Sequence, residues 1–288
     1  MIQHVDTAVR LVNSSDKQKI ANLIHFETNV HRHLDWLNPI DWIGKQPFLT
    51  IEKGHNLLAA MACPPGPQGI AWIRLFAAAT VISPEKAWKA LWNHAYEQLS
   101  NMMVTKVAVI PLHDWFHELV IQNGFEPTIQ VITLLWKKQK LPLSKRDKDI
   151  TIRSMRHDDL DDVASLDYRA FDPMWCNSQS SLETAFSQAA IATVVELKGL
   201  LIGYQISTSN QLGGHLARLA VHPEFQGAGI GYSLLCDVLQ QFDKRGAHRV
   251  SVNTQGDNII SLGLYEKAGF EKTGEEYQVF ELNLTSSE

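Results

Sequence analysis

Apolar positions in the second half of the chain recur with the spacing of helices and of strands in turn. In residues 158–171, DDLDDVASLDYRAF, apolar side chains stand three or four positions apart, as one buried face of a helix requires. Two apolar runs, 191–197 and 200–209, predict strands joined by a turn at Lys198 and Gly199. The pattern then predicts a strand, a helix, a strand, a helix and a strand at 215–221, 231–246, 248–254, 259–269 and 277–284. This alternation indicates an α/β fold in which helices cover both faces of a mixed sheet.

The first half repeats this pattern at a nearly constant distance. AVRLVNSSDKQKIANL, residues 8–23, matches TIRSMRHDDLDDVASL, residues 151–166, so that Arg10 falls on Arg153 at an offset of 143. The further matches are Asp16 with Asp159, Ala21 with Ala164, Leu23 with Leu166, 57–63 with 200–206 and, at an offset of 145, 123–128 with 268–273. Ordered matches at nearly one offset favour a duplicated domain over chance similarity.

The seam between the two copies is visible in the composition. Residues 137–149, KKQKLPLSKRDKD, are charged and broken by a proline, and they have no apolar period. Such a stretch is typical of an interdomain linker. We therefore predict a first domain at 1–138, a linker at 139–149 and a second domain at 150–288.

Composition and charge narrow the class of protein. The 288 residues are 45% hydrophobic and 20% charged, as in globular proteins. A formal net charge of -5 argues against nucleic acid as a partner, because phosphate contacts need a basic surface. Three cysteines without a close pair fit a reducing compartment, and no apolar run approaches the ~18 residues of a membrane-spanning helix. We expect a cytoplasmic protein without a membrane partner.

A glycine-rich loop follows one predicted strand and precedes a predicted helix. In AVHPEFQGAGIGYSLL, residues 220–235, glycines stand at 227, 229 and 231. Unpaired amides at a helix N-terminus favour anions, so a phosphate cradle is expected. The dinucleotide fingerprint fails because Tyr232 stands where its third glycine would be, and the Gly-Lys pair of a nucleoside-triphosphate loop is missing. A helix start with glycines for tight packing remains the alternative.

Two ordered signatures carry a family resemblance. Gln226, Gly229 and Gly231 meet the pattern Arg or Gln, two residues, Gly, one residue, Gly or Ala, and VHP precedes it at 221–223. Downstream, NIISLGLYEKAGF at 258–270 supplies an Asn followed by Leu-Tyr and Gly-Phe. Over about residues 150 to 284 the sequence strongly resembles the GNAT superfamily of acyl-CoA-dependent N-acyltransferases. The resemblance implies two tandem GNAT-like α/β (α+β) domains, each a mixed, splayed β-sheet flanked by helices.

The resemblance also implies a cofactor site in the second domain. The loop would bind the pyrophosphate of coenzyme A, and the preceding strand would pair with the pantetheine arm in a cleft where it splays from the strand at 249–254. The residues assigned to acetyl-CoA are Leu219, Ala220, Val221, Gln226, Gly227, Ala228, Gly229, Ile230, Gly231 and Asn258. No metal is assigned.

For catalysis, the family's Leu-Tyr position makes Tyr265 the expected acid that protonates the leaving thiolate. A tyrosine with a pKa of about 10 is protonated at neutral pH and can donate; the alternative is a packing tyrosine. Backbone amides near Leu219 and Ala220 are expected to stabilise the oxyanion.

The sequence does not identify the general base that would accept the proton of the amine. Relatives that acetylate ribosomal-protein N-termini carry a glutamate where this chain has Asn253. A water relay, His215 or Glu196, or an amine that is already neutral could serve instead. The segment 171–178, FDPMWCNS, is expected to border the acceptor pocket, although Trp175 there could equally be core.

The first half lacks the loop. Residues 82–87, ISPEKA, stand in place of the glycines, and Val120 falls on the position of Tyr265. We expect a degenerate domain that does not bind coenzyme A and that buttresses the second domain or shapes its cleft. HDWFH at 113–117 is interpreted as a helix start with buried aromatic residues, and the histidines of HRH at 31–33 as solvated, with no metal ligand in either.

The preferred function is an N-acetyltransferase that transfers acetyl from acetyl-CoA to a primary amine by direct attack in the second domain. The acceptor, a small molecule or a peptide N-terminus, is open, as is the oligomeric state. A tandem chain with only its second half intact also resembles mycothiol synthase, a small-molecule acetyltransferase. A non-catalytic acyl-CoA-binding sensor or scaffold is the alternative from another class.

Overall fold

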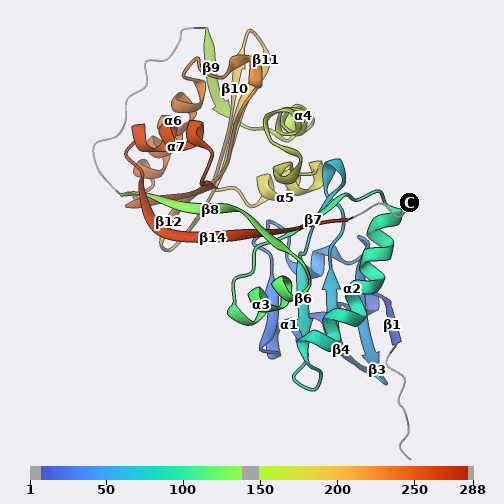
Figure 1. The fold of residues 1–288 in the computed structure, drawn as a ribbon. Helices are drawn as coiled ribbons and strands as arrows, with labels where there is room; N and C mark the ends of the chain where they lie inside the picture. The colour runs from blue at the N-terminus through green and yellow to red at the C-terminus, as the bar shows by residue number, and fades with distance from the viewer. Residues whose placement is uncertain (1–7, 138–148, 285–288) are drawn as a thin grey trace, which may run out of the picture. The chain divides into compact units, whose positions relative to one another are not determined.

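The computed structural model describes residues 8–137 and 149–284, which form two compact units (Figure 1). Unit 1 comprises Met1–Thr128 and Gln278–Glu288, and unit 2 comprises Ile129–Tyr277. The predicted linker at 139–149 lies, except for Asp149, outside the described residues. The domain boundaries given by the sequence therefore stay a prediction.

Unit 2 is one mixed sheet with helices on both faces. Its strands, in the order β14-β8-β13-β12-β11-β10-β9, are Glu271–Asn283, Glu126–Lys137, Arg249–Gln255, Gly213–Val221, Leu200–Asn210, Ile191–Leu197 and Ile150–Ser154, with β8 and β14 each extending into unit 1. Its helices are α4 (Leu160–Ala170), α5 (Gln179–Ser187), α6 (Ile230–Lys244) and α7 (Ile259–Lys267). The predicted α/β class is confirmed, and the predicted strands and helices occur in the predicted order, with β9 and α5 in addition.

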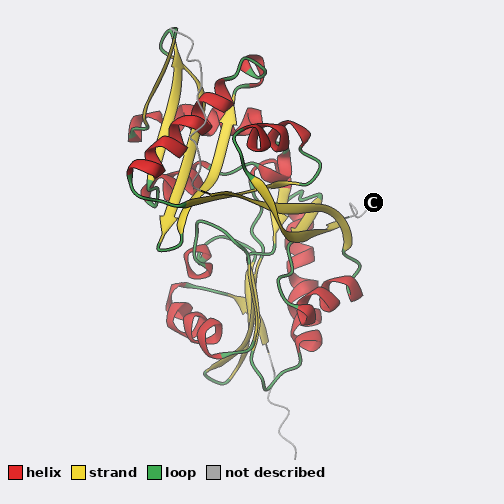
Figure 2. Ribbon diagram, turned by 90° about the vertical axis from the view of Figure 1, so that its left-hand side faces the viewer, coloured by secondary structure: helices red, strands yellow, loops and turns green. Residues whose placement is uncertain are grey.

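Neighbouring residues of β11 show how the two faces of unit 2 are covered. A Cβ added at Gly203 would lie 3.4 Å from Leu234 of α6, whereas the next residue, Tyr204, donates its hydroxyl hydrogen bond to Asp167 of α4. Successive side chains of a strand point to opposite faces. Helices α4 and α6 therefore cover opposite faces of the sheet, and Figure 2 shows helices on both sides of the strands.

The elements of the first half follow the order of the second, except that a strand, Asn29–Arg32, stands where the second half has α5 and that one further strand, Ile70–Trp72, is added. Strands β1 (Ala8–Leu11), β3 (Phe48–Lys53), β4 (Asn56–Ala62), β6 (Leu75–Ala78) and β2 (Asn29–Arg32) form one sheet in that spatial order, and β5 (Ile70–Trp72), β7 (Lys106–Val109) and the end of β14 pair separately. The helices are α1 (Lys17–Phe26), α2 (Pro84–Asn101) and α3 (Asp114–Gln122). Among the described residues, no helix combines the length and apolar character needed to span a bilayer.

An ion-pair motif near the start of each unit repeats in detail. Arg10 donates to both carboxylate oxygens of Asp16, at 2.7 and 2.8 Å, and through Nε to Glu52 at 2.7 Å. The matching residues of unit 2 are Arg153, Asp159 and Glu196, with distances of 2.7, 2.8 and 3.0 Å. Each aspartate also accepts a backbone amide three residues before it. This shared geometry supports the duplication inferred from the offset of 143.

The final strand of each half pairs with a strand of the other half. In β8, residues 131–137 pair antiparallel with β13 of unit 2. In β14, residues 280–283 pair antiparallel with β7 of unit 1. The two halves of the sequence have therefore exchanged their last strands. The nine-stranded sheet contains strands of both halves, whereas the sheet β1-β3-β4-β6-β2 comes from the first half alone.

Candidate active site

The glycine loop connects the end of β12 to the start of α6. Residues 226–229 are exposed, and Gly229 is the residue that caps α6. Gly227 and Gly229 have φ values of +78° and +83°, a left-handed conformation in which a side chain is strained. A Cβ added at either residue would meet no atom within 4 Å, and at Gly231 it would make only ordinary contacts of 3.6 Å or more. Tight packing within the chain therefore does not explain these glycines.

Backbone amides at this loop are free to bind an anion. The first hydrogen bond of α6 runs from the Ser233 amide to the Gly229 carbonyl at 3.0 Å. The amides of residues 229–232 precede it and have no backbone acceptor within the described part of the chain. They point out of the positive end of a 15-residue helix into an exposed loop. This geometry suits a phosphate group.

Strands β12 and β13 separate beside the loop. They pair in parallel at only three positions, the last being Leu216 with Val252. Each remains paired on its other side, β12 with β11 as far as Val221 and β13 with β8 as far as Gln255. The separation begins at Ala217, the extra residue of a bulge in β12. Two facing strand edges, 217–221 and 253–255, are thus left unpaired among the described residues.

The register of β12 decides which amides face the open side. The His222 amide donates to the Ile202 carbonyl at 2.9 Å, and backbone groups alternate in direction along a strand. The Ala220 amide is therefore directed at β11, while the amides of Leu219 and Val221 face the unpaired side. The Val221 carbonyl lies on that side as well, since it accepts Nε2 of Gln226 at 3.1 Å.

Tyr265 lies on α7 with its ring in the apolar core. The residue is 6% exposed, and its ring centroid lies 5.6 Å from that of Phe270. Burial raises the pKa of Tyr265, so its hydroxyl is protonated at neutral pH. That hydroxyl forms no hydrogen bond with any described residue. Asn258 is the residue before α7, and its Oδ1 accepts the Ser261 amide at 3.0 Å, so it caps the helix.

The two candidate bases, His215 and Glu196, and the position of the relatives' glutamate, Asn253, lie in different environments. Asn253 is exposed and lies on the unpaired edge of β13. His215 lies in the paired part of β12, where burial lowers its pKa and its Nδ1 is 2.9 Å from Ser251 Oγ. Glu196 lies on β10 and is bound by Arg153 of β9. Strand β11 lies between β10 and β12. Glu196 is therefore removed from the candidates.

In unit 1 the corresponding strand edge is already filled. Strand β6 pairs on one side with β4 and on the other with β2, from Asn29 with Ala78 to Arg32 with Leu75. At the start of α2, Ser83 Oγ accepts the Lys86 amide, and Pro84 has no amide hydrogen to offer. Both elements of the unit 2 site, an open edge and a free helix start, are missing from the described part of unit 1.

The histidine motifs of unit 1 are structural. His31 is 1% exposed and stacks on Phe116 at 4.2 Å, so the expectation of a solvated histidine is wrong for this residue. Burial lowers the pKa of His31 to about 3, which keeps it neutral. Helix α3 begins at Asp114 after His113 at the cap, which confirms a helix start with a buried Phe116. Within the described residues, no cluster of histidine, cysteine or acidic side chains could hold a metal.

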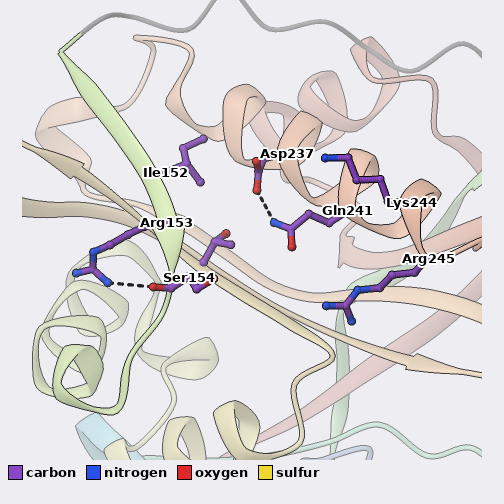
Figure 3. Close-up of a pocket in the computed structure, with 8 residues that line it drawn as sticks. Ile152, Arg153, Ser154, Asp237, Gln241, Lys244 and Arg245 are labelled. Atoms are coloured by element: carbon purple, nitrogen blue, oxygen red, sulfur yellow. Dashed lines mark hydrogen bonds between the residues drawn. The ribbon is translucent and has the colours of Figure 1, made fainter.

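Figure 3 shows a cavity of unit 2. Its volume is about 440 Å³, and its lining contains no residue of the glycine loop. It is lined by Ile152, Arg153, Ser154, Thr193, Asp237, Gln241, Lys244 and Arg245. Inside it, Gln241 donates to Asp237 at 2.7 Å. Lys244 follows Gly229 by 15 residues, about 22 Å along a helix at 1.5 Å per residue. The cavity therefore belongs to the opposite end of α6 from the glycine loop.

A mixed sheet that splays beside a glycine loop at a helix start defines a GNAT-type fold in unit 2. Residues 159–286 match the family model described as "Acetyltransferase (GNAT) domain". Residues 159–286 thus form a GNAT-type domain, which confirms the resemblance seen in the sequence.

Solved structures of similar fold cover nearly the whole chain. A GCN5-related N-acetyltransferase from Sphaerobacter thermophilus is 16% identical with a TM-score of 0.60, over 96% of both chains. A tandem GNAT protein from the clavulanic acid biosynthesis pathway is 14% identical with a TM-score of 0.64, over 98% of this chain and all of its own. A probable N-acyltransferase from Enterococcus faecalis V583 is 12% identical with a TM-score of 0.73, over 97% of this chain and 72% of its own. At these identities the comparison establishes the tandem fold.

Proposed function

We propose that the protein is an acetyl-CoA-dependent N-acetyltransferase whose single active site lies in unit 2. The observation that carries this proposal is the pair of unpaired strand edges, 217–221 and 253–255, next to a loop with free helix-start amides. An extended amide-containing chain that ends in a diphosphate matches both features. Coenzyme A has this chemistry.

In the proposed complex the amides of residues 229–232 bind the diphosphate, and the pantetheine arm pairs with β12. The acceptor amine attacks the thioester carbonyl directly. The Leu219 or Val221 amide, both facing the open side, stabilises the oxyanion. The carbon–sulfur bond then breaks, and the hydroxyl of Tyr265 protonates the leaving thiolate. The amine enters neutral, or first gives a proton to water near Asn253. After its attack on the carbonyl carbon the nitrogen loses one further proton to water, and water returns a proton to Tyr265.

A paired measurement tests the proposal. Titration calorimetry measures acetyl-CoA binding, and release of free thiol measures transfer to panels of peptides, aminoglycosides, polyamines and amino sugars. Binding at one site per chain with amine-dependent thiol release is the expected result. Failure to bind acetyl-CoA would refute the proposal. The panel also separates a peptide N-terminus from a small molecule, including the cysteinyl amino-sugar type of acceptor.

A binding protein without turnover is the second candidate. The amide at Asn253 cannot accept a proton, and the described residues place no carboxylate on the unpaired edges of β12 and β13. Tight acetyl-CoA binding with no transfer to any amine would support this reading. In either case unit 1 is proposed to have a structural role, because β2 fills its corresponding edge.

A further inference from the structure

A buried charge cluster in unit 2 connects the segment 171–178 to β12. Asp167 of α4 is 0% exposed, and its Oδ2 accepts Nε of Arg218 at 2.7 Å and the hydroxyl of Tyr204. Burial raises the pKa of Tyr204, so the phenol stays a donor. Asp167 and Arg218 neutralise each other, which a buried charge requires. The cluster thus joins α4, β11 and β12 at one point.

Three further contacts attach the segment 171–178 to this cluster. Arg218 Nη2 donates to the Trp175 carbonyl at 2.7 Å, and its guanidinium carbon lies 3.4 Å from the centre of the Phe171 ring. The other oxygen of Asp167 accepts the Asn177 amide at 2.9 Å. A guanidinium can donate in two directions and stack on a ring at once. Arg218 therefore holds the segment at Phe171 and Trp175, and Asp167 holds it at Asn177.

The position of Arg218 relates this segment to the proposed reaction. Arg218 directly follows the bulged Ala217 and precedes Leu219, whose amide faces the unpaired side of β12. It lies in the part of β12 that has separated from β13. The Arg218 side chain therefore holds segment 171–178 beside the unpaired edge of β12, where the acyl group would lie in the proposed complex.

Resting on the proposed function, we propose that Arg218 is a positioning residue that holds segment 171–178 as the wall of the amine-acceptor site. The cluster orders this wall before the acceptor binds, so it sets acceptor affinity and not acetyl-CoA affinity. Asp167 and Tyr204 act through Arg218 by fixing its guanidinium.

Cys176 provides a readout that needs no acceptor. Its Sγ lies 3.3 Å from the Phe171 carbonyl inside the segment, and it is half-buried, whereas Cys63 and Cys236 are buried. Burial raises the pKa of Cys63 to about 12, so it reacts slowly. The labelling rate of Cys176 by a small maleimide, followed by peptide mass spectrometry, therefore reports opening of the segment.

The test compares Arg218→Lys with Arg153→Lys, which loses a similar ion-paired arginine elsewhere in unit 2. Lysine keeps the charge beside Asp167 but cannot also reach the Trp175 carbonyl and stack on Phe171. Arg218→Lys should raise the Cys176 labelling rate about tenfold, the effect of one lost charged hydrogen bond. It should raise the acceptor KM by a similar factor, with acetyl-CoA affinity unchanged, and Arg153→Lys should change neither. Tyr204→Phe, which keeps the charge pair and the ring, should give a smaller change in the same direction.

Two results would overturn the proposal. One is wild-type labelling of Cys176 in Arg218→Lys, and the other is faster labelling with an unchanged acceptor KM. Failure of the proposed function has a different signature, because the wild-type protein would then not bind acetyl-CoA or would show no transfer. The labelling comparison still decides whether Arg218 orders the segment in that case.

Discussion

Replacing Gly229 by glutamate tests the assignment of the loop to a diphosphate. Gly229 has a φ of +83°, is exposed and caps α6. Any side chain there costs about 1–2 kcal/mol of folding stability, because the left-handed conformation brings Cβ close to the next carbonyl. The carboxylate would also stand at the helix start where the anion is expected.

The structure supplies a matched control for the backbone effect. Gly246 has a φ of +79°, is exposed and, like Gly229, has no atom within 4 Å of an added Cβ. It follows the other end of α6. Gly246→Glu therefore introduces the same backbone strain and the same new charge. Its position is about 25 Å from Gly229 along the helix axis, at 1.5 Å per residue.

The two variants should differ in binding alone. Two charges at about 4 Å interact with about 1 kcal/mol in water, so a glutamate beside two phosphate charges costs about 2 kcal/mol, or about 30-fold in affinity. Both variants should lose similar stability in urea unfolding. Titration calorimetry should show acetyl-CoA affinity reduced at least about 30-fold in Gly229→Glu and unchanged in Gly246→Glu. Equal affinities in the two variants would refute the loop assignment.

Three further predictions test the mechanism, the site count and the buried histidine. Tyr265→Phe keeps the ring and should lower turnover ~100- to 10,000-fold with unchanged acetyl-CoA affinity; near wild-type turnover would leave water as the acid. Calorimetry of the wild type should give one acetyl-CoA site per chain, since β2 fills the edge of β6 in unit 1, and two equivalent sites would contradict this. The pKa of His31 falls to about 3 on folding, so the unfolded chain binds the extra proton and stability is lost as pH falls from about 6.5 towards 3. His31→Gln should reduce that slope by up to about 1.4 kcal/mol per pH unit in urea unfolding at pH 7 to 4; an unchanged slope would show that His31 is not the titrating group.

Helix and strand positions in unit 2 were accessible from the sequence because their apolar periods are strong. The helix predicted at 231–246 is α6, Ile230–Lys244, and the strand predicted at 191–197 is β10. The strand predicted at 277–284 begins earlier, at Glu271. The sequence does not reveal this start, because the first residues of the strand are exposed and polar and carry no apolar period. Helix α5 was missed for a similar reason, since three of its nine residues are serines.

Features that depend on contacts distant in the chain could not be predicted. Four residues, NVHR, carry no signal that they form β2 and fill the edge of β6. The burial of His31 follows from that pairing, which the local polarity of HRH conceals. The link between Arg218 and Asp167 likewise joins residues 51 positions apart. The loop was predictable because its chemistry is local: glycines, backbone conformation and a helix start.

The exchanged final strands bear on why a half without the loop is retained. Deletion of residues 1–138 would remove β8, the strand between β13 and β14, and would leave unpaired the backbone groups of β13 that bond to it. If the second half were deleted, β7 would lose its partner in β14. Each copy is thus a component of the other's fold, and selection on the second copy protects the first. A truncation that removed either copy would therefore leave strands of the other copy without their partners.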